Sequence, residues 1–267
     1  MKKIALILTC IIMLSGCGKG TETISTAKQE EIQQISLDRL SNEAIGWGIK
    51  KNKGAPPDVP SNVKIMLSKY KGIYMGDTES KKVYLTFDEG YENGYTANIL
   101  DTLKKNNVKA AFFITGDYAE REEKLVKRMV KEGHIIGNHS MNHPSLPQLS
   151  VEETKQEMKE LDDMVEKMTG IKMKYVRPPR GEYSEKVLAN LYNQGYTSVF
   201  WSFAYMDWDV TTSMGADYAF NQIMPYIHGG CVLLLHAVSG DNAGCLERLI
   251  KEVRNAGYEF GTLDELI

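Results

Sequence analysis

The stretch KVYLTFDEG occupies residues 82–90 and carries the clearest fold signal in the chain. Its first six residues are mostly β-branched, aromatic or leucine, and two acids and a glycine follow them. Apolar residues then recur at helical spacing over residues 95–106. The segment therefore predicts a strand that ends in acidic residues and leads into a helix.

Strand-like and helix-like segments alternate over the rest of the chain. Further strands are predicted at residues 110–114, 134–137, 173–176, 197–201, 231–235 and 258–260, and further helices at 124–132, 151–169, 184–194, 216–227 and 246–256. Glycines stand where helix C-terminal caps are expected, at Gly133, Gly170, Gly195 and Gly257. Repeated strand–helix units predict a parallel α/β sheet, because each return to the same side needs a crossover helix. About seven strands favour an incomplete barrel, with an open doubly wound sheet as the alternative.

Residues 1–16 have the features of an export signal. Two lysines precede an apolar run that is too short to span a bilayer. The run ends in LSGC, residues 14–17, which resembles the lipobox of bacterial lipoproteins. That resemblance implies a lipidated Cys17 and a membrane-anchored lipoprotein at the outer face of a bacterial membrane. An ordinary secretory signal is the alternative.

Two further segments precede the first strand. Residues 17–36 are polar and lack an apolar period, which is typical of a flexible tether, here one that carries the lipid anchor. Residues 37–80 contain several glycines and prolines, and we expect an irregular lead-in that packs on the barrel. The remaining residues, 81–267, form the predicted catalytic domain. Cys231 and Cys245 are expected to be small buried hydrophobes without a catalytic role.

Composition limits the possible partners. The 267 residues are 42% hydrophobic, enough for one large core, and we expect one catalytic domain and a monomer. The net charge is −3 and the pI is near 6.0. Because no basic excess is present to attract phosphate backbones, nucleic acid is not an expected partner.

Reactive side chains gather at the C-terminal ends of the predicted strands. In parallel β/α folds these ends converge on one face, so residues far apart in sequence can share one pocket. The residues placed in this way are Asp88, Glu89, His139, His143, Arg177 and His236.

The segment HSMNHP, residues 139–144, is the strongest of these signals. His139 and His143 stand four residues apart, which lets both imidazoles face one metal if the segment turns helically. The chain has only five histidines, so this spacing directly after a strand favours a metal site over two surface histidines.

The other polar residues have both a chemical and a structural interpretation. Asp88 could act as a general base beside Glu89, or the acidic pair could form a solvated turn. His236 closes an apolar strand, where an imidazole suits protonation of a departing amine, although a lone histidine there is often structural. Arg177 opens RPPRG, whose prolines fix the backbone so that its planar donors could hold a carboxylate. A rigid surface turn is the alternative.

Five ordered segments resemble the polysaccharide deacetylase family with the NodB homology domain, carbohydrate esterase family 4. They cover residues 80–267 and are TFDE at 86–89, HSMNH at 139–143, RPPRG at 177–181, DW at 207–208 and LLH at 234–236. The resemblance implies a distorted (β/α)7 barrel and a hydrolase that removes N-acetyl groups from amino sugars of peptidoglycan glycan strands.

The family also implies a role for each matching residue. Asp88 becomes the catalytic base, His236 the general acid, and a divalent metal, expected to be zinc, activates water. The remaining roles are metal ligation by His139 and His143, orientation of Asp88 by Arg177, tuning of His236 by Asp207, an oxyanion contact from the backbone N–H of Arg180, and an acetyl pocket formed by Trp208 and Leu234.

One residue departs from the family pattern. The second acid of the first motif is usually an aspartate metal ligand, and here it is Glu89. The extra methylene shifts the carboxylate by about 1.5 Å. We predict that Glu89 still ligates the metal, while the identity of the metal stays open.

A longer segment points to a subgroup of that family. Residues 84–96, with GWG at 46–48 and FWS at 200–202, resemble deacetylases of N-acetylmuramic acid that has lost its stem peptide, which lead to muramic δ-lactam in spore cortex. The alternatives are an N-acetylglucosamine deacetylase, an inactive glycan-binding lipoprotein, and another metallohydrolase such as a phosphatase. The last lacks support because no phosphate-cradling Gly-rich loop is present.

Overall fold

The computed structural model describes residue 37 and residues 39–267. The predicted signal, tether and lipidation site at Cys17 lie outside the described residues. Contacts divide the chain into a unit that ends at Ser41 and a compact unit over Asn42–Ile267, and only the second is considered below. None of the described helices is both long and apolar enough to cross a membrane.

The second unit alternates strands and helices as the sequence predicts. The strands are β1 (Ile45–Gly46), β2 (Lys50–Asn52), β3 (Ala55–Asp58), β4 (Lys82–Glu89), β5 (Ala111–Ile114), β6 (Ile135–Asn138), β7 (Tyr175–Val176), β8 (Glu182–Tyr183), β9 (Thr197–Ser198), β10 (Cys231–His236) and β11 (Glu259–Gly261). The α-helices are α2 (Ser61–Lys69), α3 (Thr96–Lys105), α4 (Gly116–Arg121), α5 (Glu123–Lys131), α6 (Val151–Thr169), α7 (Glu185–Asn193), α8 (Ala216–Ile223) and α9 (Gly240–Asn255). Short 3₁₀ turns occur at η1 (Leu146–Gln148), η2 (Pro179–Gly181), η3 (Met224–Tyr226) and η4 (Leu263–Leu266).

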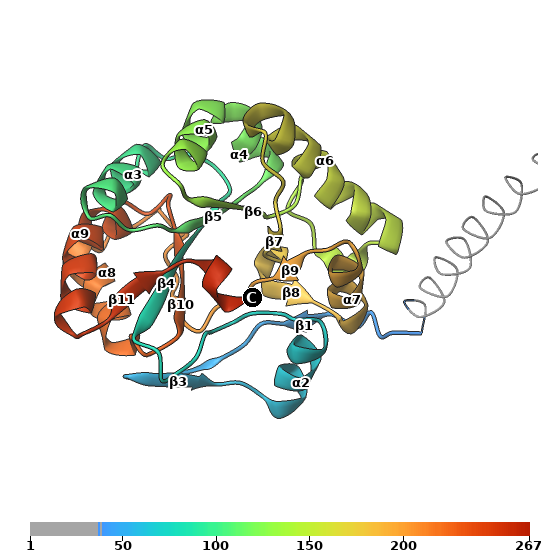
Figure 1. Cartoon of the computed structure of the whole chain (residues 1–267), viewed down its shortest axis with the longest axis horizontal. Helices are drawn as coiled ribbons and strands as arrows, with labels where there is room; N and C mark the ends of the chain where they lie inside the picture. Colours follow the sequence, from blue (N-terminus) through green and yellow to red (C-terminus); the bar gives the residue numbers. More distant parts are fainter. Residues whose placement is uncertain (1–36, 38) are drawn as a thin grey trace, which may run out of the picture. The chain divides into compact units, whose positions relative to one another are not determined.

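The main sheet is parallel and curls on itself. Its strand order is β10-β4-β5-β6-β7-β9, with β11 also paired to β4. After β9 the chain runs back to β10, where Phe203 forms a parallel bridge with Leu233. Helices α3, α5, α6, α7 and α9 lie around the outside of the strands (Figure 1). The predicted distorted barrel is confirmed, and the open doubly wound alternative does not hold.

Side-chain alternation gives the sheet two faces. Tyr84, Phe113, Tyr175 and Val232 form a cluster inside the curled sheet. The alternate positions of the same strands, such as Phe87, belong to the large core that also includes helix residues. Successive residues of a strand point to opposite faces, so position within the strand decides whether a side chain reaches the interior.

The parallel register brings the C-terminal ends of the strands together. His236 on β10 pairs with Asp88 on β4, and Asp88 pairs in turn with Phe113 on β5. Asp88 and His236 have the same parity as the interior residues Tyr84 and Val232. Both side chains are therefore directed to the interior at the same end of the sheet.

Several elements differ from the sequence prediction. Residues 46–80 are more regular than expected, because they contain β2, β3 and α2. Helix α9 begins at Gly240 instead of residue 246, since the Ser239 side chain caps it by accepting the N–H of Asn242. Helix α4 was not predicted. The four cap glycines have the positive φ angles expected of them, between 76° and 89°.

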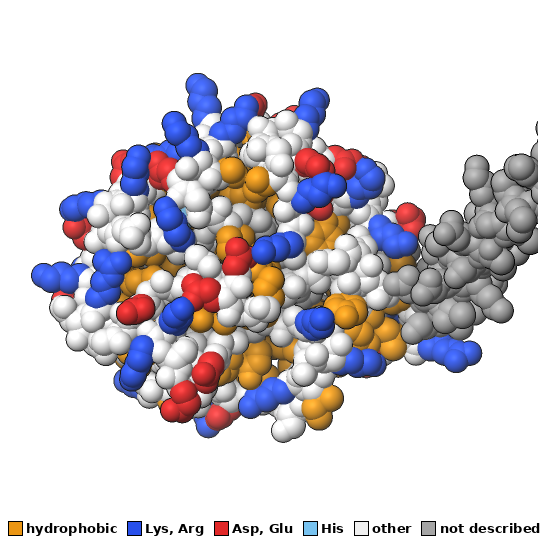
Figure 2. All heavy atoms as spheres, in the orientation of Figure 1, with side chains coloured by type: hydrophobic (Ala, Val, Ile, Leu, Met, Phe, Trp, Pro, Cys, Tyr) orange, Lys and Arg blue, Asp and Glu red, His pale blue; other side chains and the backbone are white. Residues whose placement is uncertain are grey.

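The lead-in segment contacts the region of the third motif. Strand β1 pairs antiparallel with β8, directly after RPPRG. Trp47 donates its backbone N–H to the carbonyl of Gly181 and its indole N–H to the carbonyl of Trp201. Its ring stacks on Phe200 at 4.6 Å between centroids. On the face of the unit shown in Figure 2, basic and acidic side chains are interspersed.

Candidate active site

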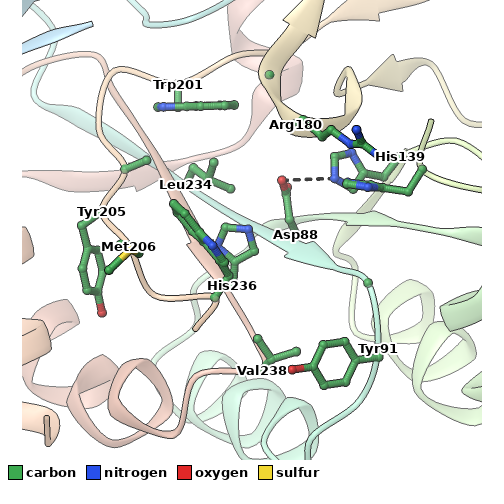
Figure 3. Close-up of a pocket in the computed structure, with 15 residues that line it drawn as sticks. Asp88, Tyr91, His139, Arg180, Trp201, Tyr205, Met206, Leu234, His236 and Val238 are labelled. Carbon is green, nitrogen blue, oxygen red and sulfur yellow. Dashed lines mark ion pairs between the residues drawn. The ribbon is translucent and has the colours of Figure 1, made fainter. Parts of the chain in front are cut away.

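A cavity of about 620 Å³ opens at the C-terminal ends of the strands. The predicted site residues that line it are Asp88, His139, His143, Arg180, Trp208, Leu234 and His236. Figure 3 shows Asp88 directed toward His139, with His236 on the neighbouring strand. The sequence did not indicate several other lining residues, namely Tyr91, Tyr205, Met206 and Val238.

Asp88 is buried and lies between an arginine and a histidine. Its Oδ1 accepts a hydrogen bond from Nη1 of Arg177 at 2.6 Å, and its Oδ2 lies 3.5 Å from Nε2 of His139. Burial alone would raise the pKa of Asp88, but the charge and the hydrogen bond of the Arg177 guanidinium lower it overall. Asp88 is therefore ionised at neutral pH, as a base must be.

Arg177 is completely buried and holds the carboxylate in place. Besides Asp88, its guanidinium donates to Oγ1 of Thr86 at 2.9 Å and, through Nε, to the carbonyl of Val199 at 3.1 Å. The guanidinium lies over the ring of Phe113, 4.1 Å from its centroid. This arrangement makes the predicted contact between Arg177 and Asp88, while Thr86 is a partner that sequence reasoning missed.

His139 and His143 lie together, but not on a helical turn. Their ring centroids are 4.8 Å apart. Ser140 and His143 both have positive φ, 66° and 56°, so a tight turn brings the rings together instead. Ser140 stabilises the turn, because its Oγ accepts the backbone N–H of His143 at 2.9 Å.

Both rings have the chemical form that a metal requires. Nδ1 of His139 donates to the carbonyl of Arg177 at 2.8 Å, which leaves the lone pair of Nε2 free toward the cavity. Burial lowers the pKa of His139, and burial together with the neighbouring His139 lowers that of His143 to about 4. Two neutral imidazoles therefore suit a divalent cation.

Glu89 is not placed beside these histidines, which contradicts its predicted position. It follows Asp88 on β4, so strand alternation directs it to the helix-covered face, and it does not line the cavity. Both carboxylate oxygens are buried, and neither has a hydrogen-bond partner in the part of the chain that the structure describes. Burial, and then the charges of Glu92 and Asp88, raise the pKa of Glu89 well above its ordinary value. Among the described residues no three His, Cys, Asp or Glu side chains are grouped to hold a metal.

Half-buried His236 and buried Asp207 form a second hydrogen-bonded pair. Nδ1 of His236 donates to Oδ1 of Asp207 at 2.7 Å, and the backbone N–H of His236 donates to Oδ2 at 2.8 Å. Burial lowers the pKa of His236, but the hydrogen bond and charge of Asp207 outweigh it and raise the pKa overall. The geometry leaves Nε2 of a readily protonated imidazole available at the cavity.

The three predicted substrate-binding residues lie around this pair and the histidines. Arg180 has φ = 59°, a left-handed conformation that is uncommon for a residue with a side chain and is often found at functional sites. The ring of Trp208 contacts His236 edge to face at 5.5 Å, and 53% of this residue is exposed. Leu234 is buried in the cavity wall.

Comparison with known proteins agrees with this geometry. The polysaccharide deacetylase family profile matches residues 75–199. Peptidoglycan-N-acetylmuramic acid deacetylase PdaA of Bacillus subtilis is 42% identical over 86% of this chain and 88% of its own length. Its solved structure, described as a family 4 carbohydrate esterase, matches with a TM-score of 0.83 over 85% of this chain and 98% of that chain. The chain belongs to carbohydrate esterase family 4.

Two other relatives are an uncharacterised protein and a deacetylase of a different amino sugar. An uncharacterised 30.6 kDa protein of Geobacillus stearothermophilus is 48% identical over 85% of this chain and 87% of its own length. A peptidoglycan-N-acetylglucosamine deacetylase of Bacillus cereus is 33% identical over 75% of this chain and 73% of its length. The family predicted from the five motifs is confirmed, and it contains deacetylases of both amino sugars.

Members of carbohydrate esterase family 4 are in general metal-dependent. In this chain His139 and His143 fit a divalent cation in position and in protonation state, whereas Glu89 does not. The identity of the metal, predicted to be zinc, stays a prediction.

Proposed function

We propose that this family 4 esterase is a peptidoglycan N-deacetylase whose substrate is N-acetylmuramic acid without its stem peptide. Deacetylation of that sugar would lead to muramic δ-lactam in spore cortex. The proposal includes export and a lipid anchor on Cys17, which would hold the enzyme at the outer face of a membrane beside the glycan strands.

The observation that carries the choice of substrate is the side chain of Arg180. It is exposed at the cavity, and among the described residues it forms no ion pair. The other arginine of the motif, Arg177, is committed to Asp88. Muramic acid that has lost its peptide carries a free lactyl carboxylate, which a guanidinium can bind through two parallel hydrogen bonds. N-acetylglucosamine offers no such group.

Sequence similarity supports the same choice. The muramic acid deacetylase of Bacillus subtilis is 42% identical to this chain, against 33% for the N-acetylglucosamine deacetylase of Bacillus cereus. The second sugar is the alternative substrate. An inactive glycan-binding protein is a weaker alternative, because the Asp88–Arg177 and His236–Asp207 pairs are both intact.

The proposed mechanism uses the Asp88–Arg177 and His236–Asp207 pairs at different steps. Asp88, held by Arg177, takes a proton from a water molecule while the oxygen of that water bonds to the carbonyl carbon of the acetyl group. The backbone N–H of Arg180 donates to the developing oxyanion. His236 then gives its proton to the sugar nitrogen as the C–N bond breaks, so the products are acetate and the free amine.

The remaining groups bind and polarise the acetamide. Trp208 and Leu234 would enclose the acetyl methyl group. A divalent metal bound to His139 and His143 would supply a Lewis acid for the carbonyl.

The test is acetate release by the full chain from peptide-free peptidoglycan, intact peptidoglycan and chitin oligomers, with and without chelator. We expect release from the peptide-free glycan, and expect Arg180→Gln to lower it by about tenfold, the effect of losing roughly 1.4 kcal/mol of charge-assisted binding. Arg180→Lys keeps the charge and should lose less.

Chitin oligomers provide the control, because the backbone N–H of Arg180 is retained in both variants. Any activity on this neutral glycan should be unchanged by Arg180→Gln. Equal losses on charged and neutral glycans, or wild-type activity confined to N-acetylglucosamine, would overturn the muramic acid assignment. No acetate release from any glycan would favour the glycan-binding alternative.

A further inference from the structure

The first turn of α9 lies directly behind the His236–Asp207 pair. Asn242, three residues after the capping Ser239, is 1% exposed. Its Nδ2 donates to Oδ2 of Asp207 at 2.6 Å and also approaches the carbonyl of His236 at 3.2 Å. One side chain therefore contacts both members of the pair, although it lies outside all five sequence motifs.

The orientation of the Asn242 amide is fixed by its surroundings. The hydroxyl of Tyr205 donates a hydrogen bond to Oδ1 of Asn242. A flipped amide would turn its oxygen toward the Asp207 carboxylate, where two acceptors would repel each other. The helix cap adds a second restraint, because Ser239 accepts the backbone N–H of Asn242 at 3.3 Å.

The contact matters because Asp207 has few other partners. Among the described residues, its Oδ1 accepts only the imidazole N–H of His236, and its Oδ2 accepts the backbone N–H of His236 and the amide of Asn242. Removing the amide would leave the buried Oδ2 with a single donor. A buried carboxylate that loses a donor is expected to shift toward other groups or water.

We infer that Asn242, oriented by Tyr205, is a positioning residue for the proton donor His236, because it holds Asp207 at hydrogen-bonding distance from the imidazole. The inference rests on the proposed function in one respect, namely that His236 protonates the leaving amine. Figure 3 places Tyr205 beside the cavity on the same side as His236. The hydrogen-bond chain runs from Tyr205 through Asn242 and Asp207 to His236.

The test compares leaving groups of different basicity, using Asn242→Ala and Tyr205→Phe in the full chain. A sugar amine must be protonated as it leaves, whereas 4-nitrophenolate leaves from 4-nitrophenyl acetate without a proton. We expect Asn242→Ala to lower kcat on the peptide-free glycan by about 10- to 100-fold, with KM little changed. Its loss on 4-nitrophenyl acetate should stay within roughly threefold, because that reaction needs no general acid.

The second variant covers the case in which Asn242→Ala does not fold. Tyr205→Phe removes one hydroxyl, and a smaller loss of the same kind is expected. Because both residues act through the same series of hydrogen bonds to His236, the double variant should be no slower than Asn242→Ala alone. Asn255→Ala is the matched control, since Asn255 is on the same helix and its side chain donates a hydrogen bond to Glu252 at the surface.

A spectroscopic measurement tests the geometry independently of turnover. The Nδ1 proton of His236, bonded to Asp207, should give a low-field proton resonance that Asn242→Ala broadens or shifts and that Asn255→Ala preserves. An unchanged resonance, unchanged kcat, or equal losses on both substrates would overturn the inference. If the resonance responds but the wild type releases no acetate from glycan, the proposed function fails while the positioning role stands.

Discussion

Two adjacent carboxylates on β4 have opposite environments. Asp88 faces the cavity, where Arg177 donates to it and lowers its pKa. Glu89 faces the helices, where neither oxygen has a hydrogen-bond partner among the residues described and burial raises its pKa. The two residues differ by one methylene and one step along a strand. Their difference teaches that the face of the strand, more than the residue type, decides which acid can do chemistry.

The largest effect should come from Asp88→Asn. The amide keeps the shape of the side chain but cannot take a proton from water, so kcat should fall roughly 10²- to 10⁴-fold. Acetate release measures the rate, and a thermal melt verifies that the variant is folded. A near-normal rate in a folded variant would show that Asp88 is not the catalytic base. The proposed chemical difference between Asp88 and Glu89 would then be wrong.

A second partnered carboxylate, Asp207, sharpens the comparison. His236 must be protonated to act as an acid, so kcat should fall as pH rises through its pKa, which lies above the ordinary value of 6.5. Asp207→Asn removes the charge that raises this pKa while burial remains, so the alkaline limb of the kcat profile should move to lower pH. At neutral pH we expect a loss of about 10- to 100-fold.

Asp209→Asn is the control for that measurement. Asp209 is exposed and accepts hydrogen bonds from Thr211, away from His236, so its substitution should leave the pH profile in place. If Asp207→Asn leaves the alkaline limb where it is in the wild type, Asp207 does not act on His236.

The smallest effect on turnover should come from Glu89→Gln, which we expect to change kcat by less than about threefold. A metal ligand would behave differently, because its loss would increase the metal concentration needed for activity. Titrating metal into the chelator-treated wild type and variant distinguishes the two cases. A large increase in the required metal would restore Glu89 as a ligand and contradict its position in this structure.

The same variant should change stability in a pH-dependent way. The folded state keeps the proton of Glu89 at pH values where the unfolded chain has released it, so stability is lost as pH rises from the ordinary glutamate range through the raised folded pKa. Glu89→Gln removes this loss. Its melting temperature should therefore match the wild type near pH 4 and exceed it increasingly toward neutral pH.

The fold was predictable because hydrophobic periodicity is a local property. Helix α6 has the predicted bounds, residues 151–169, and Ser150 with Glu153 forms a capping box at its start. The bounds of short strands were harder to predict. Strand β9 has only two residues, and the residues that follow it pair with other strands through isolated β-bridges. The lead-in helix α2 was missed because three prolines precede it within a few residues.

The site was predictable where the motif residues shared one strand face. Asp88, His139, Arg177 and His236 have the parity of the strand positions that face the interior, so the family pattern and the structure agree. Glu89 failed because adjacency in sequence means opposite faces in a strand. Asn242 was missed because its contact with Asp207 spans 35 positions and depends on where α9 begins.

The pairing of β1 with β8 determines where the catalytic domain can be cut. A chain shortened to residue 81 would retain every motif residue but lose Trp47, leaving the carbonyls of Gly181 and Trp201 without its N–H donors and one face of Phe200 uncovered. Those residues adjoin Arg180, whose left-handed backbone depends on its neighbours for support. We therefore expect an active fragment to need the lead-in segment as well as residues 81–267, and the compact unit that begins at Asn42 is the fragment to produce.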